Sequence, residues 1–454
     1  MNKRGVIASV LALVAAGIPA GAAVGGPAVK VEDLTLRAYM DAPTPGTNKI
    51  HRKESYSKVL WYNEDTEEYY SSASPYSSPE KFVKLFTFEN LDGYPSLNYT
   101  TAYLPNGDVL FVYDSQFGGE TYSDEEIAAP YSIAIDNKHR RNPIIAVASE
   151  GYKLHIIDFG DRLKPTGWLQ NIGQHYSFRH KAFYFAEYTR ANLRSCNGWK
   201  VSGDLRNPDN WSVRASRLID FPYKVGTKHF HIAQEDPYTG VVYFSTGDRN
   251  AGLYASADGT DFVQLDKNDR AKWRMLNAVF TKDYVWWASD DWVDNHRFWQ
   301  CSRDASGVID PESLNLIYKF PYFKVDSRAT YGNIYFSKYD VIVFLDRWDG
   351  GNPEVGLLPV YMYDIKKGEI KKLTDIVRRE GLAGTSMWGF RCRTMEMYPT
   401  GSTAVVSFDS FHPNELPFGR PSPDSPAPKN LVLSLTRDAS GNYHLDITPL
   451  GEGR

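Results

Sequence analysis

Short runs of aromatic and β-branched residues, separated by turn residues, recur along most of this 454-residue chain. From about residue 82 onward, each unit has a first strand, a turn such as LPNGD, DPYTG, TKDY, SKYD or YPTGS, and an aromatic second strand. About seven units of roughly 40–60 residues follow one another, which is the spacing of propeller blades with four strands each. Because no unit can bury both faces of its sheet by itself, the units are expected to stack radially. We therefore predict an all-β fold, a single β-propeller with seven blades or, as the alternative, six.

The predicted units cover residues 98–115, 141–160, 178–218, 229–256, 273–304, 330–370 and 390–449. Helical periodicity is scarce, and the best helical candidate is the short stretch 375–382 (DIVRREGL). Parallel α/β folds require crossover helices, so their absence from the pattern excludes that class.

The N-terminal part differs from the units. Residues 1–26 join Lys3 and Arg4 to a run rich in Ala and Gly, which predicts a secretory signal peptide or, alternatively, a membrane anchor. Residues 27–80 are polar and rich in tyrosine, and 57–64 is their one convincing strand, so this segment is an arm or the strand that closes the ring. The propeller is then expected over 81–454, in a protein that is secreted, periplasmic or at the cell surface.

The composition limits the classes of partner that the chain can bind. The formal net charge is −4, so no basic field for nucleic acid is present. No second apolar stretch is long enough to span a bilayer, which predicts no membrane contact beyond the N-terminal segment. Cys196, Cys301 and Cys392 lie far apart, and their spacing indicates neither a disulfide framework nor a zinc site.

The first strand of each blade lines the channel of a propeller, so residues that open the units should converge there. Arginine and histidine recur at these openings, and arginine presents a planar fork of donors that matches carboxylate, sulfate or phosphate. We therefore expect an anionic ligand. The substrate-binding candidates are Arg179, His180, Arg190, Arg274, Tyr331, Arg391 and Arg393.

His229 and His231 share one face of a strand, because side chains two residues apart point the same way. Two imidazoles suit a metal, but the local sequence supplies no third ligand. Functional imidazoles and buried, hydrogen-bonded histidines are the other two interpretations. Each arginine likewise has a structural alternative, an ion pair with an acid of the next blade.

The stretch 256–262 (SADGTDF) resembles an Asp box, the turn signature of sialidase-type BNR-repeat propellers, with one residue fewer between Asp and Gly and a final Phe for Trp. The wider block 178–350 is similar to sialidase-like propeller proteins of bacteria and their phages. It carries HFH, DPYTG, STGD and SADG, followed by Trp273-Arg274 and VFTKDYVWW (279–287).

The resemblance implies a carbohydrate-active protein that recognises and cleaves an acidic oligosaccharide or polysaccharide. The cleavage would be a sialidase-like glycoside hydrolysis or the elimination of a polysaccharide (uronate) lyase. In a lyase His229, His231 and Tyr188 would serve as base and acid, while Arg190 and Arg274 would neutralise the carboxylate so that the α-proton becomes removable. The alternative is a non-catalytic glycan-binding or adhesion propeller, such as a phage receptor-binding or tail protein. None of these chemistries requires a cofactor, and a structural calcium ion is compatible with the fold.

Overall fold

The computed structural model describes part of the chain, and every structural statement below concerns that part. The described residues are 34–41, 56–63, 66, 68–72, 81–87, 97–103, 109–114, 143–148, 154–157, 174–177, 179–186, 198–204, 211–215, 230–247, 252–267, 272–289, 297–320, 328–348, 357–377, 391–392, 401–409 and 430–450. The predicted signal peptide or anchor lies outside them. No helix among these residues is long and apolar enough to cross a membrane.

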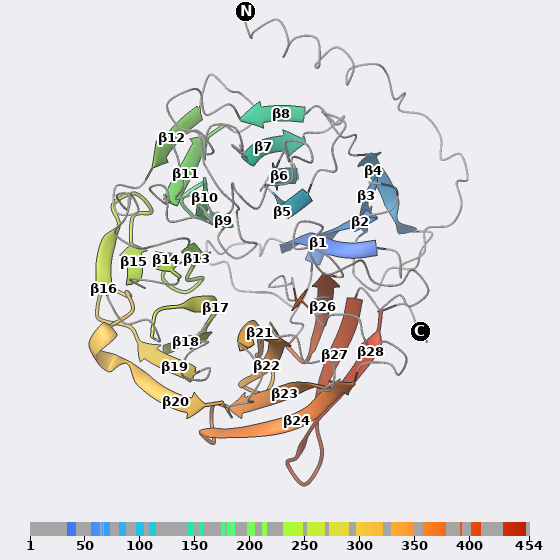
Figure 1. Ribbon diagram of the computed structural model, residues 1–454, viewed down its shortest axis with the longest axis vertical. Coiled ribbons are helices and arrows are strands. Elements are labelled where there is room, and N and C mark those ends of the chain that lie inside the picture. Colours follow the sequence, from blue (N-terminus) through green and yellow to red (C-terminus); the bar gives the residue numbers. More distant parts are fainter. Residues whose placement is uncertain are drawn as a thin grey trace, which may run out of the picture.

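The described residues form seven antiparallel sheets of four strands each, and every sheet is built from four consecutive strands. Figure 1 shows these sheets arranged around a central axis, with β1, β5, β9, β13, β17 and β21 innermost in their sheets and the fourth strand of each sheet outermost. The all-β propeller fold predicted from the sequence is therefore confirmed.

The first three sheets contain β1 to β12. Their strands are β1 (Leu34–Asp41), β2 (Tyr56–Asn63), β3 (Glu68–Ser72), β4 (Val83–Thr87), β5 (Leu97–Tyr103), β6 (Val109–Asp114), β7 (Pro143–Ala148), β8 (Leu154–Ile157), β9 (Gln174–Ser177), β10 (Ala182–Ala186), β11 (Gly198–Gly203) and β12 (Trp211–Ala215).

The last four sheets contain β13 to β28 and one short 3₁₀ turn, η5 (Pro311–Ser313), between β19 and β20. Their strands are β13 (Phe230–Glu235), β14 (Val242–Thr246), β15 (Gly252–Ser256), β16 (Val263–Lys267), β17 (Met275–Phe280), β18 (Tyr284–Ser289), β19 (Arg297–Ser302), β20 (Asn315–Lys319), β21 (Arg328–Phe336), β22 (Val341–Trp348), β23 (Leu357–Asp364), β24 (Glu369–Val377), β25 (Arg391–Cys392), β26 (Thr403–Asp409), β27 (Asn430–Arg437) and β28 (Tyr443–Pro449).

The division into units differs from the prediction in three places. The segment 34–87 holds a complete sheet, β1 to β4, instead of one closing strand. Residues 98–115 and 141–160, predicted as two units, belong to one sheet, β5 to β8. The predicted helix at 375–382 begins inside β24, which pairs with β23 up to Leu357–Val377, so sheet pairing overrides the local helical pattern.

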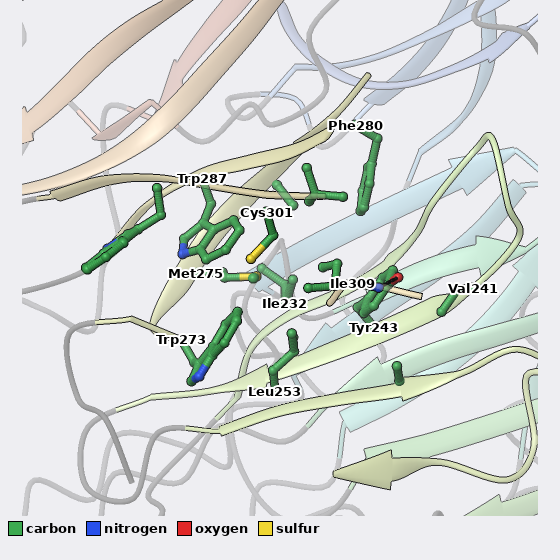
Figure 2. Packing of buried hydrophobic residues seen from close by; sticks show 14 residues of the cluster. Ile232, Val241, Tyr243, Leu253, Trp273, Met275, Phe280, Trp287, Cys301 and Ile309 are labelled. Atoms are coloured by element: carbon green, nitrogen blue, oxygen red, sulfur yellow. Dashed lines mark hydrogen bonds between the residues drawn. The ribbon is translucent and has the colours of Figure 1, made fainter. Parts of the chain in front are cut away.

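The core lies between successive sheets, because each sheet is covered on both faces by its neighbours. The middle strands are accordingly buried at every position in β10, β14 and β15, while the outermost strand β20 is exposed or half-buried throughout. Figure 2 shows one such layer, where Ile232 and Leu253 of the fourth sheet meet Trp273, Met275 and Trp287 of the fifth. The stacked rings of Trp273 and Trp287 lie 5.3 Å apart.

The ring closes through packing. The innermost strands β5, β9, β13, β17 and β21 each lie beside the innermost strand of the preceding sheet, and β1 of the first sheet lies against β26 and β27 of the last. In the described part of the chain, no hydrogen-bonded ladder links one sheet to another.

Candidate functional site

The predicted site residues divide into two sets at opposite ends of the innermost strands. His231 is the second residue of β13, and Arg274 directly precedes β17. Both are buried, His231 at 1% exposure and Arg274 at 4%. Tyr331 lies on β21 and Arg391 begins β25. Their roles in binding or catalysis, including that of His231, stay predictions.

Arg179 and His180 were predicted to open the first strand of a unit, but they do not. They lie in the turn after β9, which joins it to β10. Arg179 Nη1 donates to the carbonyl oxygen of Thr239, and His180 Nε2 lies 2.7 Å from the carbonyl oxygen of Gly240. Both contacts lie beyond the C-terminal end of β13, whereas His231 lies near its N-terminal end, so the structure separates the two pairs. The candidates His229, Tyr188, Arg190 and Arg393 fall outside the described residues.

Four contacts between the third and fourth sheets share one separation in sequence. His175 meets Glu235, Arg179 meets Thr239, His180 meets Gly240 and Lys200 meets Thr260, and the two residues of each pair are 60 positions apart. The two sheets therefore run in a common register over this seam. Gly240 and Gly259 have positive φ values of 80° and 68°, and a Cβ at Gly259 would lie 2.7 Å from His180 Cγ, so these turns approach the third sheet too closely for a side chain.

The turn that resembles an Asp box is built by one carboxylate. Asp258 Oδ1 accepts hydrogen bonds from the backbone N–H groups of Asp261 (2.8 Å) and Thr260 (2.7 Å) and from the hydroxyl of Ser256 (2.8 Å). These bonds, that of Asp261 first, lower the pKa of Asp258 to about 2. Phe262 closes the turn by packing 5.1 Å from the ring of Phe244. The motif is thus explained by the chemistry of a tight turn.

A chain of side-chain amides crosses the innermost strands of three sheets. Gln234 on β13 donates to Asn277 Oδ1 on β17 at 2.9 Å, and its own amide oxygen accepts from the N–H of Ala278 at 2.8 Å. Asn277 Nδ2 donates to the carbonyl oxygen of Asn333 on β21 (3.3 Å), and Asn333 Nδ2 donates back to the carbonyl of Asn277 (2.9 Å). The innermost strands therefore present polar groups to one another, and buried polar groups of this kind hold the strands in a defined register.

The one described pair on an innermost strand that suits proton transfer is His175 with Glu235. His175 Nε2 on β9 lies 3.4 Å from Glu235 Oε2 on β13. The histidine side chain is 35% exposed and the carboxylate 8%. Burial raises the pKa of Glu235, but hydrogen bonds from His175 and Ser177 and the nearby imidazoles outweigh it, so the net pKa is lowered.

The sequence did not predict this pair. QHYS (174–177) precedes the stretch chosen as the opening of its unit, and nothing local connects it with a glutamate 60 residues later. One signal could have found it. Every unit has a first strand before its turn, so the strand that precedes FRHK, and not FRHK itself, should be the innermost strand of its sheet. Among the described residues, no three His, Cys, Asp or Glu side chains gather closely enough to hold a metal ion.

No protein-family model matches the chain, and no curated protein is similar to it in sequence. Solved structures share its architecture at low identity. A protein from Lactobacillus plantarum has a TM-score of 0.46 and 11% identity over 91% of this chain and 95% of the other. A putative 6-phosphogluconolactonase from Bacteroides fragilis has a TM-score of 0.43 and 11% identity, over 91% of this chain and 97% of the other. Prolyl oligopeptidase B from Galerina marginata has a TM-score of 0.45 and 10% identity, over 92% of this chain and 55% of the other.

These comparisons contradict the predicted family. No sialidase-type (BNR, Asp-box) family model matches the chain, and the similar structures are described as putative 6-phosphogluconolactonases and prolyl endopeptidases, so the predicted sialidase-type family was wrong. The predictions that rested on it were wrong with it: a lyase or glycoside hydrolase, a glycan-binding alternative, and an acidic glycan as partner. The physical reason is visible in the turn at Asp258, because a Ser-x-Asp-Gly-Thr sequence satisfies its own backbone whatever the family.

Proposed function

We propose that the chain is a hydrolase that activates water with His175 and cleaves an ester or lactone bond. The observation that carries the proposal is the contact of 3.4 Å between His175 Nε2 and Glu235 Oε2. A general base requires an imidazole with one nitrogen held and the other free to accept a proton. Both conditions follow from the environment of this pair.

Glu235 fixes the tautomer. Its lowered pKa keeps the buried carboxylate ionised at neutral pH, and an ionised carboxylate only accepts hydrogen bonds. The proton of His175 therefore resides on Nε2, and Nδ1 carries the lone pair. Within the described residues, Nδ1 has no hydrogen-bond partner, and the half-buried ring leaves room for water.

The reaction balances with these groups. Nδ1 takes a proton from water as the water oxygen bonds to the carbonyl carbon of the substrate. The carbon–oxygen bond to the leaving alcohol then breaks, and the alkoxide receives the proton from His175. Arg179 and Lys181, both exposed in the turn that follows β9, favour a substrate that carries a negative charge.

The test measures acid release from 6-phosphogluconolactone, gluconolactone and an aryl acetate with a pH indicator. The first compound is included because similar structures are described as putative 6-phosphogluconolactonases. We expect turnover above the spontaneous rate and a loss of about 10²–10⁴-fold in kcat for His175→Ala. His444→Ala is the matched control, because His444 forms another histidine–carboxylate pair, with Asp438 at 3.2 Å on an exposed surface. Equal rates for both variants would refute the proposal.

A further inference from the structure

Ser177 carries a fully buried hydroxyl beside the pair formed by His175 and Glu235. It ends β9 two residues after His175, so the two side chains lie on the same face of the strand. The backbone N–H of His180 donates to Ser177 Oγ at 2.9 Å, and the hydroxyl hydrogen-bonds the carboxylate of Glu235. Because an ionised carboxylate only accepts hydrogen bonds, the hydroxyl proton points to Glu235.

Two other side chains near Glu235 use their protons elsewhere. Tyr184 lies close to the carboxylate, but its hydroxyl donates to the carbonyl oxygen of Gly259 at 2.7 Å. His180 also lies close, and its Nε2 lies 2.7 Å from the carbonyl oxygen of Gly240, which can only accept. Neither side chain can therefore replace the serine hydroxyl.

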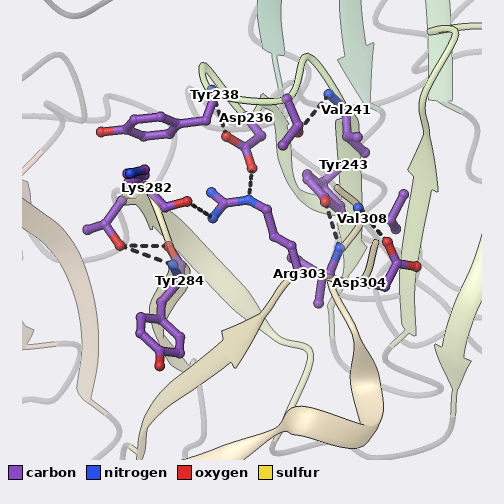
Figure 3. Close-up of polar contacts among 12 residues, drawn as sticks. Asp236, Tyr238, Val241, Tyr243, Lys282, Tyr284, Arg303, Asp304 and Val308 are labelled. Atoms are coloured by element: carbon purple, nitrogen blue, oxygen red, sulfur yellow. Dashed lines mark hydrogen bonds and ion pairs between the residues drawn. The ribbon is translucent and has the colours of Figure 1, made fainter. Parts of the chain in front are cut away.

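The nearest cation of the fifth sheet is engaged by the next residue along the chain. Asp236 accepts hydrogen bonds from Arg303 Nε at 2.6 Å and from the backbone N–H of Tyr238 at 2.9 Å (Figure 3). The guanidinium group of Arg303 therefore neutralises Asp236. In the described part of the chain, Glu235 takes its side-chain donors from the third sheet.

We propose that Ser177 is a positioning residue for the general base His175. The hydroxyl holds the carboxylate of Glu235 so that one oxygen stays directed to His175 Nε2, and the imidazole keeps one orientation. The terminal torsion of a glutamate is soft, so a carboxylate held by a single donor turns and anchors the imidazole poorly. Ser177 is buried and does not touch the substrate. The role rests on the hydrolase proposed above, whereas the contact with Glu235 does not.

The test titrates the carboxyl group of Glu235 by ¹³C NMR in the full chain labelled with glutamate, and Glu235→Gln assigns the signal. In Ser177→Ala the pKa of Glu235 should rise by about 0.5 or more, because the charged form loses a hydrogen bond. The matched control is Ser245→Ala, which removes another fully buried hydroxyl, one that donates to the carbonyl oxygen of Met275 at 3.2 Å. It should leave the pKa of Glu235 unchanged.

Turnover separates positioning from a merely structural role. For whichever of the three test compounds is hydrolysed, Ser177→Ala should lower kcat about tenfold and keep KM within about twofold. The reason is that the buried hydroxyl orients the base without binding the substrate. Ser245→Ala should change neither constant.

If Ser177→Ala does not fold, as judged by circular dichroism, Ser177→Cys decides, because a thiol has a similar shape and is only a weak donor. It should raise the pKa of Glu235 in the same direction. An unchanged pKa of Glu235 in the variant that folds would overturn the proposal, as would a raised KM with an unchanged kcat. A raised pKa in a protein without turnover would support the contact between Ser177 and Glu235 and refute the hydrolase alone.

Discussion

Glu235 and Asp236 are adjacent in the chain, yet they pair with opposite neighbours of their sheet. Glu235 ends β13 and contacts His175 of the third sheet, whereas Asp236 begins the following turn and contacts Arg303 of the fifth. Successive side chains of an extended segment point to opposite faces, which is why two neighbouring carboxylates serve two seams. The fourth sheet therefore contacts both neighbouring sheets through charged side chains at the C-terminal end of β13.

The stability of the contact between His175 and Glu235 should depend on pH. The folded-state pKa of Glu235 is lowered from its ordinary value of 4.5, so its contribution is present above that value and is lost as the pH falls through the lower folded value. At pH 6 we expect the unaltered protein to have a larger free energy of unfolding than the Glu235→Gln variant. This difference should shrink below pH 4.5. Urea unfolding between pH 6 and 3 measures this. A difference that does not change with pH would contradict the assignment.

The turn after β15 depends on Asp258. Replacement by Ala removes the acceptor of three hydrogen bonds, so Asp258→Ala should lower the free energy of unfolding by about 1–2 kcal/mol. Asp446→Ala, at an exposed position of β28, is the control and should change it by less than about 0.5 kcal/mol. Equal effects in denaturant unfolding would show that the carboxylate does not organise the turn.

The amide chain across the innermost strands should be sensitive to Asn277. Asn277→Ala leaves Gln234 Nε2 without its acceptor and the carbonyl of Asn333 without its donor. Unsatisfied buried groups of this kind cost about 3 kcal/mol together. Asn315→Ala, an exposed position of β20, should be nearly neutral in the same unfolding measurement. A loss below about 1 kcal/mol for Asn277→Ala would mean that water replaces the amide.

Cys301 should be inert in the folded protein. It is a fully buried free thiol packed between the fourth and fifth sheets, and burial raises its pKa to about 12. Because the thiolate is the reactive form, a variant with Cys196→Ser and Cys392→Ser should react with iodoacetamide at pH 8 only when urea unfolds it. Mass spectrometry of the labelled protein follows the reaction. Rapid labelling without urea would show that this seam opens.

Local patterns predicted the fold class because the information lies in short turns. The stretch DPYTG forms the turn 236–240 between β13 and β14, where the N–H of Gly240 donates to the carbonyl of Asp236 at 2.7 Å. The sheet formed by 34–87 was missed because its strands carry polar residues and tyrosines, which give no clear alternation. The helical prediction at 375–382 failed for another reason, because pairing with β23 overrides the local pattern at 375–377.

The candidate site was less accessible to prediction, because it consists of contacts between sheets. A pair such as His175 and Glu235 requires the register of one sheet against the next, and a single sequence carries no signal for that register. Arg179 and His180 were predicted to open an innermost strand, but they follow β9, and their side chains contact the turn 236–240.

The closure of the ring by β1 against β26 and β27 has a topological consequence. Each sheet draws its four strands from one continuous stretch, and no seam between sheets contains a ladder in the described part of the chain. A circularly permuted chain, opened between β16 and β17 and joined at its original ends by a linker long enough to connect them, would keep every ladder intact. The order in which the chain visits the sheets is therefore separable from the architecture that the sheets form.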